Sequence, residues 1–557
     1  MKYKRTPIGI SDFKKLRVGN CYWIDKSLFI KDVVESAEVL LYPRPRRFGK
    51  TINLSMLRYF YDCREDNSSL FSDLAISQEA EIMQKQGKYP VIFFTFKDVK
   101  GNDFEQCLDA IRLIISQLYL EHIYLLDSDF MHPFEKFIYN QIIEKKSNQA
   151  ELEHSIKKLG DFLKKYHKEN PVILIDEYDM PIHSAYLNGY YEHLITFIRN
   201  MLSACLKDNV VLEKAVLTGI LRVAKESIFS GLNNLKVNSI LSKESSDRFG
   251  FTDKEVEKCL KDYDLSDKLQ IVKDWYDGYN FYDHEIYNPW SILNFIMEKQ
   301  IKPYWVNTSG NDLIKLLLQK ANSTTKKDLE ILVEKGTLSR EIQDNIVYGE
   351  IENNTNSLWN FLLMSGYLRY DNLVENYFSW SADLKIPNKE VQYLFETQVI
   401  KSWFNLANQD IQLDNVLDEL TRGDLDSFIK AFTDFCLDSF SYFDVSGNEP
   451  ERFYHAFVLG MITSLRPRYT IRSNRESGYG RYDIMMIPAD KNQRGFIFEF
   501  KKIDQYEKEN FETALQNAKN QVVQKNYARE LLDQGIQTIV YVVAVFDKKE
   551  VKAEWFV

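Results

Sequence analysis

Gly49, Lys50 and Thr51 have the residue types and the order of a phosphate-binding loop. The apolar segment Val39–Tyr42 before them predicts a buried strand, and a helical pattern over Lys50–Tyr61 follows them. The N-terminus of a helix presents unpaired N–H groups to a phosphate. In such a loop the lysine reaches the β- and γ-phosphates and the threonine hydroxyl holds Mg²⁺. We therefore expect Lys50 to bind the phosphates of ATP and Thr51 to bind Mg²⁺.

The loop departs from the common pattern G-x-x-x-x-G-K-[ST], which has glycine where this chain has Arg44. It lacks one close approach of the backbone and carries three arginines instead. Two of these, Arg46 and Arg47, are candidate nucleotide-binding residues together with Gly49. A GKT triplet also occurs by chance, and the alternative interpretation is a basic turn that caps a core helix.

The segment Pro171–Pro181 (PVILIDEYDMP) favours the nucleotide-binding interpretation, because four apolar residues lead into Asp176 and Glu177. Buried ionised groups are costly unless they are paired or bound to metal. At this strand end an aspartate holds Mg²⁺ through water, and a neighbouring glutamate can polarise the attacking water as general base. The alternative is an exposed strand end whose acids are solvated.

The strand predicted over Lys214–Leu217 ends at Thr218. A polar residue there is placed to sense the γ-phosphate, and Arg222 just beyond it could reach the charge that develops on transfer. The alternative for Arg222 is a surface salt bridge. Nearer the N-terminus, Asp25 and Lys26 could touch nucleotide, although a surface ion pair is the favoured interpretation.

Three further polar residues, Asp483, Glu499 and Lys501, lie in two apolar segments near the C-terminus. Side chains alternate along a strand, so Glu499 and Lys501 share a face while Phe500 points to the core. With Asp483 on a neighbouring strand, two acids and a lysine would suit Mg²⁺ or Mn²⁺ that activates water against a phosphodiester. The alternative is an ion-paired strand edge without cleavage.

Five arginines precede or accompany Asp483 and would suit phosphate contacts, or could equally form a solvated face. They are Arg466, Arg468, Arg472, Arg475 and Arg481.

The elements around these residues predict an α/β protein. Alternating strands and helices, with another apolar strand at Val91–Phe96, indicate a doubly wound, mostly parallel P-loop sheet with its ligand at the carboxyl ends of the strands. A helix (Glu451–Leu465), two strands, a helix (Asn510–Leu532) and a final strand (Thr538–Phe546) predict a C-terminal α-β-β-α-β domain. An aromatic cluster favours core packing over base stacking, and its members are Trp275, Tyr276, Tyr279, Tyr282 and Trp290.

The motifs RPRRFGKT and LIDEYD resemble those of the AAA-ATPase-like family of bacterial P-loop proteins, which replace the first Walker glycine in this way. Tyr22–Ile30, Leu217–Leu235 and Trp275–Leu293 extend the resemblance over about the first 300 residues. It implies domain boundaries at 1–235 for the P-loop domain and 236–310 for a small winged-helix-like lid. Residues 311–440 predict amphipathic helices with few strands.

Residues 441–557 resemble the PD-(D/E)xK nuclease superfamily, in the version found C-terminal to AAA-ATPase-like domains. NRESGYGRYDI and FIFEFKK carry the resemblance. It implies that Asp483 is the motif aspartate, that Glu499 and Lys501 form the ExK, and that Glu451 is the first-helix glutamate and a metal ligand. Gln521 and Tyr527 match the later helix, with valine after Gln521 as a mild departure.

The totals set limits on function. A chain of 557 residues, 45% hydrophobic and 27% charged, is globular and too long for one core, and its length suggests three or four domains. A net charge of −10 argues against a protein that binds nucleic acid over its whole surface, so any contact with DNA needs a local basic surface. The six cysteines show no metal spacing, the N-terminus lacks the apolar core of a signal peptide, and the longest apolar runs, such as Ile539–Phe546, are too short to span a membrane. We expect a cytoplasmic protein with reduced thiols, and leave oligomerisation open.

The resulting hypothesis is an ATP-binding, ATP-hydrolysing module whose nucleotide state gates a Mg²⁺- or Mn²⁺-dependent nuclease acting on nucleic acid, expected to be DNA. By analogy, such coupling fits phage-defence or mobile-element biology. The rival is a nucleotide-dependent switch or binding protein whose nuclease fold grips DNA without cutting it. A helicase or translocase is disfavoured because no further helicase motifs are evident.

Overall fold

The computed structural model describes most of the chain in two compact units. The first contains residues 1–313 and 335–391, and the second contains 314–334 and 392–557. The described residues are 3–223, 234–308, 317, 323–333, 336–346, 351, 354–375, 379–395, 410–439, 458–459, 461–462, 465, 468–477, 480–503, 509–547 and 550–557. Each unit is considered by itself, and the boundaries of the four proposed domains stay predictions.

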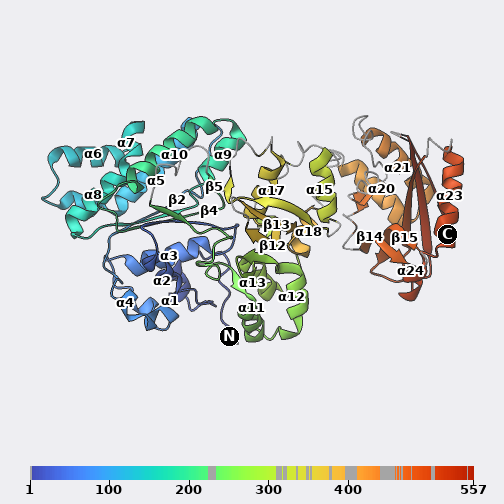
Figure 1. The fold of residues 1–557 in the computed structure, drawn as a ribbon, viewed down its shortest axis with the longest axis horizontal. Coiled ribbons are helices and arrows are strands. Elements are labelled where there is room, and N and C mark those ends of the chain that lie inside the picture. The colour runs from blue at the N-terminus through green and yellow to red at the C-terminus, as the bar shows by residue number, and fades with distance from the viewer. Residues whose placement is uncertain are drawn as a thin grey trace. The chain divides into compact units, whose positions relative to one another are not determined.

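A five-stranded parallel sheet forms the centre of the first unit, which confirms the predicted sheet (Figure 1). The strand order is β2-β3-β4-β1-β6. The strands are β1 (Val39–Pro43), β2 (Val91–Thr95), β3 (Val172–Asp176), β4 (Lys214–Gly219) and β6 (Leu235–Val237). Strands β1, β3 and β4 are buried along their whole length, as expected for strands of a parallel sheet that is covered on both faces.

Helices cover both faces of this sheet. On one side lie α1 (Phe13–Val18), α2 (Phe29–Glu35) and α3 (Lys50–Tyr61), and on the other lie α5 (Phe104–Glu121), α8 (Ser155–His167) and α10 (Tyr191–Leu206) (Figure 1). The remaining helices of this part are α4 (Ala80–Met83), α6 (Pro133–Ile143), α7 (Gln149–Glu153) and α9 (Met180–Asn188). The chain is therefore doubly wound.

Strand β4 lies between β1 and β3 in space, whereas the strand between them in the sequence, β2, lies at the edge of the sheet. Tyr42 of β1 pairs with Thr218 of β4, and Ile175 of β3 pairs with Leu217. The carboxyl ends of β1, β4 and β3 therefore meet at one edge, with Thr218 beside both predicted nucleotide motifs.

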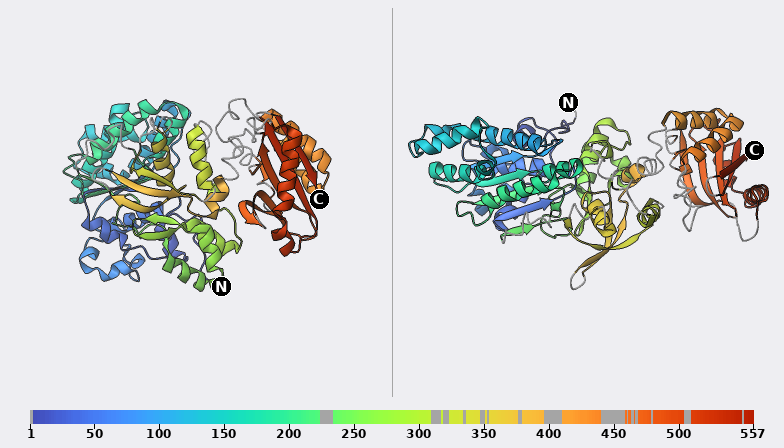
Figure 2. Two further views of the ribbon diagram at one scale, coloured as in Figure 1. Left: turned by 45° about the vertical axis from the view of Figure 1, so that its right-hand side comes forward. Right: turned by 90° about the horizontal axis from the view of Figure 1, so that it is seen from above.

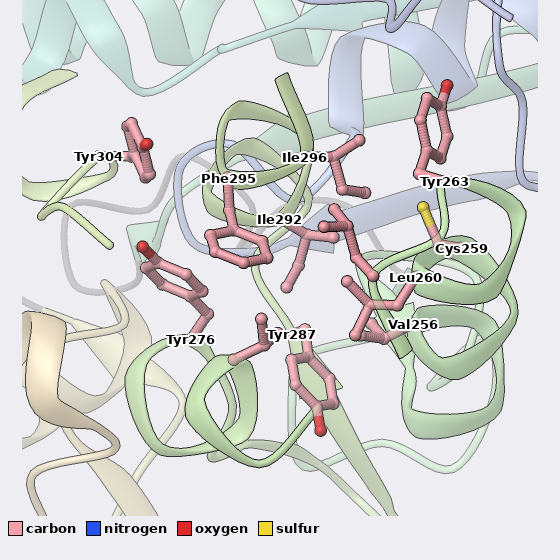
Figure 3. Close-up of a cluster of buried hydrophobic side chains, with 12 residues drawn as sticks. Val256, Cys259, Leu260, Tyr263, Tyr276, Tyr287, Ile292, Phe295, Ile296 and Tyr304 are labelled. Atoms are coloured by element: carbon pink, nitrogen blue, oxygen red, sulfur yellow. The ribbon is translucent and has the colours of Figure 1, made fainter. Parts of the chain in front are cut away.

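A second, smaller core follows the parallel sheet. Its antiparallel strands have the order β7-β9-β8, with β7 (Phe251–Thr252), β8 (Tyr279–Phe281) and β9 (His284–Tyr287). Helices α11 (Asp253–Asp262), α12 (Leu269–Tyr276) and α13 (Pro289–Glu298) bury side chains such as Val256, Tyr276 and Phe295 (Figure 3). Trp275 and Trp290 pack against this core, which confirms a packing role, whereas Tyr282 is exposed.

Residues 336–395 contain a second antiparallel sheet that the sequence analysis did not foresee. Its order is β10-β13-β12, with β10 (Leu338–Ile342), β12 (Arg369–Glu375) and β13 (Trp380–Lys385). These strands are short, and polar residues occupy alternate or exposed positions, so the apolar signal is weak. The same part holds α17 (Thr355–Met364), α18 (Lys389–Leu394) and β11 (Asn345–Ile346), which pairs with β5 (Arg222–Val223).

The second unit contains a five-stranded mixed sheet in the order of the chain, β14 to β18. Its strands are β14 (Tyr469–Ser477), β15 (Gly480–Pro488), β16 (Gly495–Lys502), β17 (Ile539–Asp547) and β18 (Glu550–Phe556). Only β16 and β17 are parallel, because α23 (Phe511–Gln524) and α24 (Arg529–Asp533) connect them. The edge strands β14 and β18 add to the predicted α-β-β-α-β order.

Helix α23 covers one face of this sheet (Figure 2), where Ala514 and Leu515 pack against Val543 and Val545. Helix α21 (Leu425–Ser439) packs against β18, and Nε1 of Trp555 donates to Asp426 at 2.8 Å. The same unit also contains helices α15 (Ser323–Val333) and α20 (Asp410–Arg422).

Among the described residues, no helix has both the length and the apolar character needed to cross a membrane. All six cysteines fall in described segments and are free thiols, five of them buried.

Candidate nucleotide and nuclease sites

The loop between β1 and α3 has the geometry of a phosphate-binding loop whose lysine is folded back onto it. Gly49 caps α3 with a φ of 88°, a left-handed conformation that glycine adopts without strain. Lys50 is buried, and its Nζ donates to the carbonyl oxygens of Arg44 and Pro45 at 2.8 Å each. Burial lowers the pKa of Lys50, while Glu177, Asp179 and Asp176 oppose that shift. Three carboxylates therefore act on the lysine.

Asp176 accepts hydrogen bonds from hydroxyl groups on three different elements. Its Oδ2 accepts from Thr51 at 2.8 Å and from Thr95 at 3.3 Å, and its Oδ1 accepts from Thr218 at 2.7 Å. The carboxylate is fully buried, so these hydroxyls replace the water that it loses. The structure thus brings together Thr51, Asp176 and Thr218, three of the residues that the sequence singles out.

Arg44, which stands in place of the loop glycine, is fully buried. Its guanidinium lies 5.0 Å from the ring of Phe249 and 5.2 Å from that of Phe281, and its Nη1 donates to the carbonyl of Asn238 at 2.6 Å. Desolvation lowers the pKa of Arg44 to about 10. This arginine anchors the start of the loop in the protein interior rather than presenting its charge to a ligand.

The other two loop arginines are more accessible. Arg46 is half-buried, and its backbone carbonyl accepts from Nδ2 of Asn288 and Nε1 of Trp305. Arg47 is exposed, has a φ of 69°, and places its guanidinium 4.4 Å from the ring of Trp290. Their side chains are available to a ligand, and nucleotide binding by them stays a prediction.

Glu177 follows Asp176 in a left-handed conformation, with a φ of 52°. Non-glycine residues rarely adopt this conformation, and it is frequent at functional sites. Burial raises the pKa of Glu177, and Lys50 opposes that shift. The side chain is therefore held at a sharp turn, close enough to Lys50 for the two charges to interact.

Asp179 belongs to this site although its place in the sequence did not indicate it. This buried residue accepts the backbone N–H groups of Ile220 and Leu221 at Oδ2, at 2.8 and 2.9 Å. Burial raises its pKa, while these two N–H groups oppose the shift. Asp179 stands just before α9 with a proline near the helix start, a pattern that predicts a helix cap, but its side chain instead holds the loop after β4.

Arg222 lies three residues beyond Gly219 and forms an ion pair with Asp344 at 3.4 Å. The structure therefore contains a salt bridge of the kind that was the alternative interpretation for Arg222. A contact of Arg222 with the charge that develops during phosphate transfer stays a prediction. Lys26 donates to Glu255 at 2.7 Å, in a pair that is largely buried rather than on the surface. Asp25 accepts the backbone N–H of Ala75 at 2.7 Å, so both N-terminal residues have structural partners.

The C-terminal cluster, which consists of Asp483, Glu499 and Lys501, lies on the face of the sheet that α23 covers. Ile497 and Ile503, two residues before Glu499 and two after Lys501, pack against the helical layer. Glu499 is buried, and its Oε1 accepts from Nε2 of Gln521 on α23 at 2.6 Å. Phe500 points to the opposite face and contacts the ring of Phe546, as predicted.

Asp483 joins this cluster from the neighbouring strand. Ile484 pairs with Phe498, so Asp483 and Glu499 occupy the next opposed positions. Oδ2 of Asp483 accepts the backbone N–H of Phe500 at 2.7 Å, which ties the aspartate to the strand that carries Glu499 and Lys501. Lys501 is partly exposed. Gln521 also reaches Tyr527 at 3.4 Å, so both later-helix residues belong to this site.

The predicted first-helix glutamate and the five arginines near Asp483 fall partly within the described residues. Glu451 and Arg466 lie outside the described residues, as do the side chains of Arg475 and Arg481. Arg472 pairs with Glu530 of α24, and Arg468 is exposed. Within the described segments, no group of three or more His, Cys, Asp or Glu residues could hold a metal ion.

Comparisons with known proteins agree with this architecture. Residues 7–229 match the family model described as "Predicted AAA-ATPase", and residues 449–556 match that of the PD-(D/E)XK nuclease superfamily. An Azotobacter chroococcum mcd 1 protein, described as "Uncharacterized protein in vnfD 5'region", is 24% identical over 512 residues, or 90% of each chain.

The family matches confirm the two domain types and support nucleotide binding together with a nuclease-like function. Families of these types generally use nucleotide and divalent metal. The donor set of the first site fits Mg²⁺, because a threonine hydroxyl and a carboxylate, both oxygen donors, lie together beside the loop lysine. At the second site, Asp483 and Glu499 supply two carboxylates suited to Mg²⁺ or Mn²⁺.

Proposed function

We propose that this chain, an AAA-ATPase-like domain joined to a PD-(D/E)XK nuclease domain, binds and hydrolyses ATP and uses the nucleotide state to gate cleavage of nucleic acid. The observation that carries the proposal is the position of Asp176. It binds the hydroxyl of Thr51 in the loop and the hydroxyl of Thr218 on the central strand. Two structural elements that would contact the nucleotide thus share one carboxylate.

Each residue of the first site has a role in this proposal. Lys50 exchanges its two loop carbonyls for the β- and γ-phosphates, because an ammonium group is attracted more strongly by an anionic phosphate oxygen than by a neutral carbonyl oxygen. Thr51 and Asp176 would hold Mg²⁺, which neutralises developing phosphate charge when bound. Glu177 orients and deprotonates the attacking water. Lys50 favours the ionised form of Glu177 that this step requires.

Thr218 and Arg222 report the γ-phosphate in this proposal. Thr218 lies at the end of β4, between the strands that carry the loop and Asp176. Arg222 lies further along the same segment, which Asp179 holds through the backbone of Ile220 and Leu221. A change at the phosphate would therefore reach β5 and its partner strand β11 through a short, well-bonded connection.

At the second site, Asp483 and Glu499, with Glu451, would hold Mg²⁺ or Mn²⁺, which supplies an activated water when bound. Lys501 stabilises the attacking hydroxide or the charge that builds on the phosphate. Gln521 orients Glu499 through its hydrogen bond. DNA is the proposed substrate, and defence against phage or mobile elements is the biology that such gated cleavage would serve.

The test is incubation of the full chain with plasmid, linear and single-stranded DNA in Mg²⁺ or Mn²⁺, with and without ATP. The proposal requires cleavage whose rate changes on addition of ATP and which Glu499→Ala removes. Equal cutting by wild type and Glu499→Ala would identify a contaminant. Tight DNA binding without cutting, in every combination of metal and ATP, would favour the rival, a nucleotide-dependent switch whose nuclease fold grips DNA.

A further inference from the structure

The phosphate-binding loop is held from outside by residues of the smaller core and of segment 336–395. The carbonyl of Phe48 accepts from the N–H of Gly250 at 3.0 Å, and its ring packs against Tyr279 and Phe281. A Cβ built on Gly366 would lie 2.8 Å from Cβ of Pro45, so this glycine allows close packing on the loop. Loop conformation therefore depends on residues distant in the sequence.

The backbone of Arg46 is the most specific of these contacts. Its carbonyl accepts from Nε1 of Trp305 at 3.1 Å and from Nδ2 of Asn288 at 3.4 Å. Because a trans peptide is planar, a fixed carbonyl of Arg46 also fixes the direction of the N–H of Arg47 on the opposite side. Phosphate-binding loops act through such backbone N–H groups, so Trp305 controls a group of the kind that binds the ligand.

Trp305 is in turn held by Glu390. Both residues are fully buried. Oε1 of Glu390 accepts the backbone N–H of Trp305 at 2.5 Å, and Oε2 accepts the hydroxyl of Ser291 at 2.8 Å. Glu390 lies on α18, the helix in which the chain passes from the first unit to the second at residue 391. This carboxylate thus links the loop to the segment that leads toward the nuclease domain.

No cation balances Glu390 among its described partners. Burial raises its pKa to about 7, and the groups that oppose the shift are the Ser291 hydroxyl and the N–H groups of Trp305 and Val306. The other titratable groups that face it are the phenols of three tyrosines, whose own pKa values it helps to raise. They are Tyr276, Tyr279 and Tyr304, the first and last of which are seen in Figure 3.

We infer that Glu390 is a positioning residue of the nucleotide site, which acts through Trp305 to hold the carbonyl of Arg46 in the conformation that binds ATP. The inference rests on the proposed function. The described groups that hydrogen-bond to the carboxylate are all donors, so the ionised form holds Trp305 best, and protonation loosens it. ATP affinity therefore falls as Glu390 takes up its proton near neutral pH.

The experiment is calorimetric titration of the full chain with Mg-ATP from about pH 6 to about pH 8.5, on either side of the Glu390 titration. Wild type is compared with Glu390→Gln, Trp305→Phe and the double variant. Glu375→Gln, which alters an exposed glutamate on β12, is the matched control. Thermal unfolding of each variant checks that it is folded.

We expect Glu390→Gln to weaken binding about tenfold at the alkaline end, the equivalent of one buried hydrogen bond. The difference from wild type should vanish at the acid end, where Glu390 is neutral. The two proteins are compared as the ratio of their ATP affinities at each pH, because the titration of ATP itself affects both affinities equally. Trp305→Phe, which removes the Nε1 donor together with part of the buried ring system, should weaken binding at least as much, and the double variant should lose no more than Trp305→Phe alone.

Equal affinities of wild type and Glu390→Gln at every pH would overturn this inference alone. A Glu390→Gln defect that is the same at both ends of the pH range would also overturn it, because a purely structural loss has no pH dependence. If wild type binds no ATP at any pH, the proposed function and this inference fall together.

Discussion

The hydroxyl of Thr51 donates to Oδ2 of Asp176 at 2.8 Å, although 125 positions separate the two residues. One lies in the first turn of α3 and the other at the end of β3, and β4 separates β3 from the strand that precedes α3. This bond joins the two nucleotide motifs of the sequence into one site.

Lys50→Ala should reduce ATP affinity by about a hundredfold or more, because several charge-assisted hydrogen bonds to phosphate are lost. Calorimetry of the full chain with Mg-ATP measures this loss. Lys88→Ala, which removes an exposed lysine, is the control and should bind as wild type does. Unchanged affinity in Lys50→Ala would remove the basis for the phosphate assignment.

Glu177→Gln should still bind ATP, while its turnover falls by on the order of a hundredfold or more, the usual contribution of a positioned base. The amide keeps the size of the side chain and its place at the turn but cannot accept a proton. Phosphate release under saturating ATP measures turnover, and calorimetry measures binding. Full turnover by this variant would show that another group is the base.

Gly219→Ala should lower the free energy of unfolding by about 1–3 kcal/mol, as expected for overpacking. The added Cβ would lie 2.7 Å from Oδ1 of Asp179 and 2.8 Å from Cε1 of Tyr178, both on buried side chains. Gly160→Ala, within helix α8, is the control, since the nearest atom to its added Cβ outside the helix would be Cγ of Pro171, at 3.5 Å. That change should be neutral or stabilise by up to about 1 kcal/mol. Urea unfolding measures the stability of both variants. If Gly219→Ala is as stable as Gly160→Ala, the loop after β4 moves to make room for the added Cβ.

Stability should depend on pH through two buried acids. Burial raises the pKa of Glu390 to about 7 and that of Asp277 to about 7, from the values of 4.5 and 3.8 for exposed groups. Between the pKa values of the exposed groups and the raised pKa values of the native state, the native protein holds protons that the unfolded chain has released. The contribution of these protons to stability is therefore full below the pKa values of the exposed groups, and it is lost as the pH rises toward 7. Urea unfolding at several pH values should show less of this decline in Glu390→Gln than in Glu375→Gln. An identical slope in both variants would contradict the shift at Glu390.

Lys501→Ala should abolish DNA cleavage while divalent metal still binds, whereas Glu499→Ala should weaken metal binding and abolish cleavage together. The reason is that the acids supply oxygen ligands and the lysine supplies only charge at the reacting phosphate. Mn²⁺ titration and the DNA panel measure the two effects, and ATP binding should be unchanged in both variants. Metal loss in Lys501→Ala would mean that the lysine organises the acids instead.

Local patterns in the sequence are sufficient for several of these features. The segments Val39–Pro43 and Val172–Ile175 are continuous apolar runs, which is typical of buried strands in a parallel sheet. Gly49 before a helical pattern predicts the capped N-terminus of α3. The family resemblance and the α/β class follow from such segments, because each depends on contacts between residues close in the chain. The roles of the site residues stay predictions.

Only the tertiary structure decided how these segments meet. Strand order places β4 beside β1, so that Thr218 reaches Asp176, while β2 lies at the edge of the sheet. Burial of Arg44 between aromatic rings, the bond of Asp179 to the loop after β4, and the connection from Glu390 to the loop all join distant segments. Every buried polar group needs a hydrogen-bonding partner, and many residues of the sequence could supply one. Which of them does so is decided only when the chain folds. Spacing in the sequence therefore identifies the groups that can do chemistry, but packing selects the groups that hold them in place.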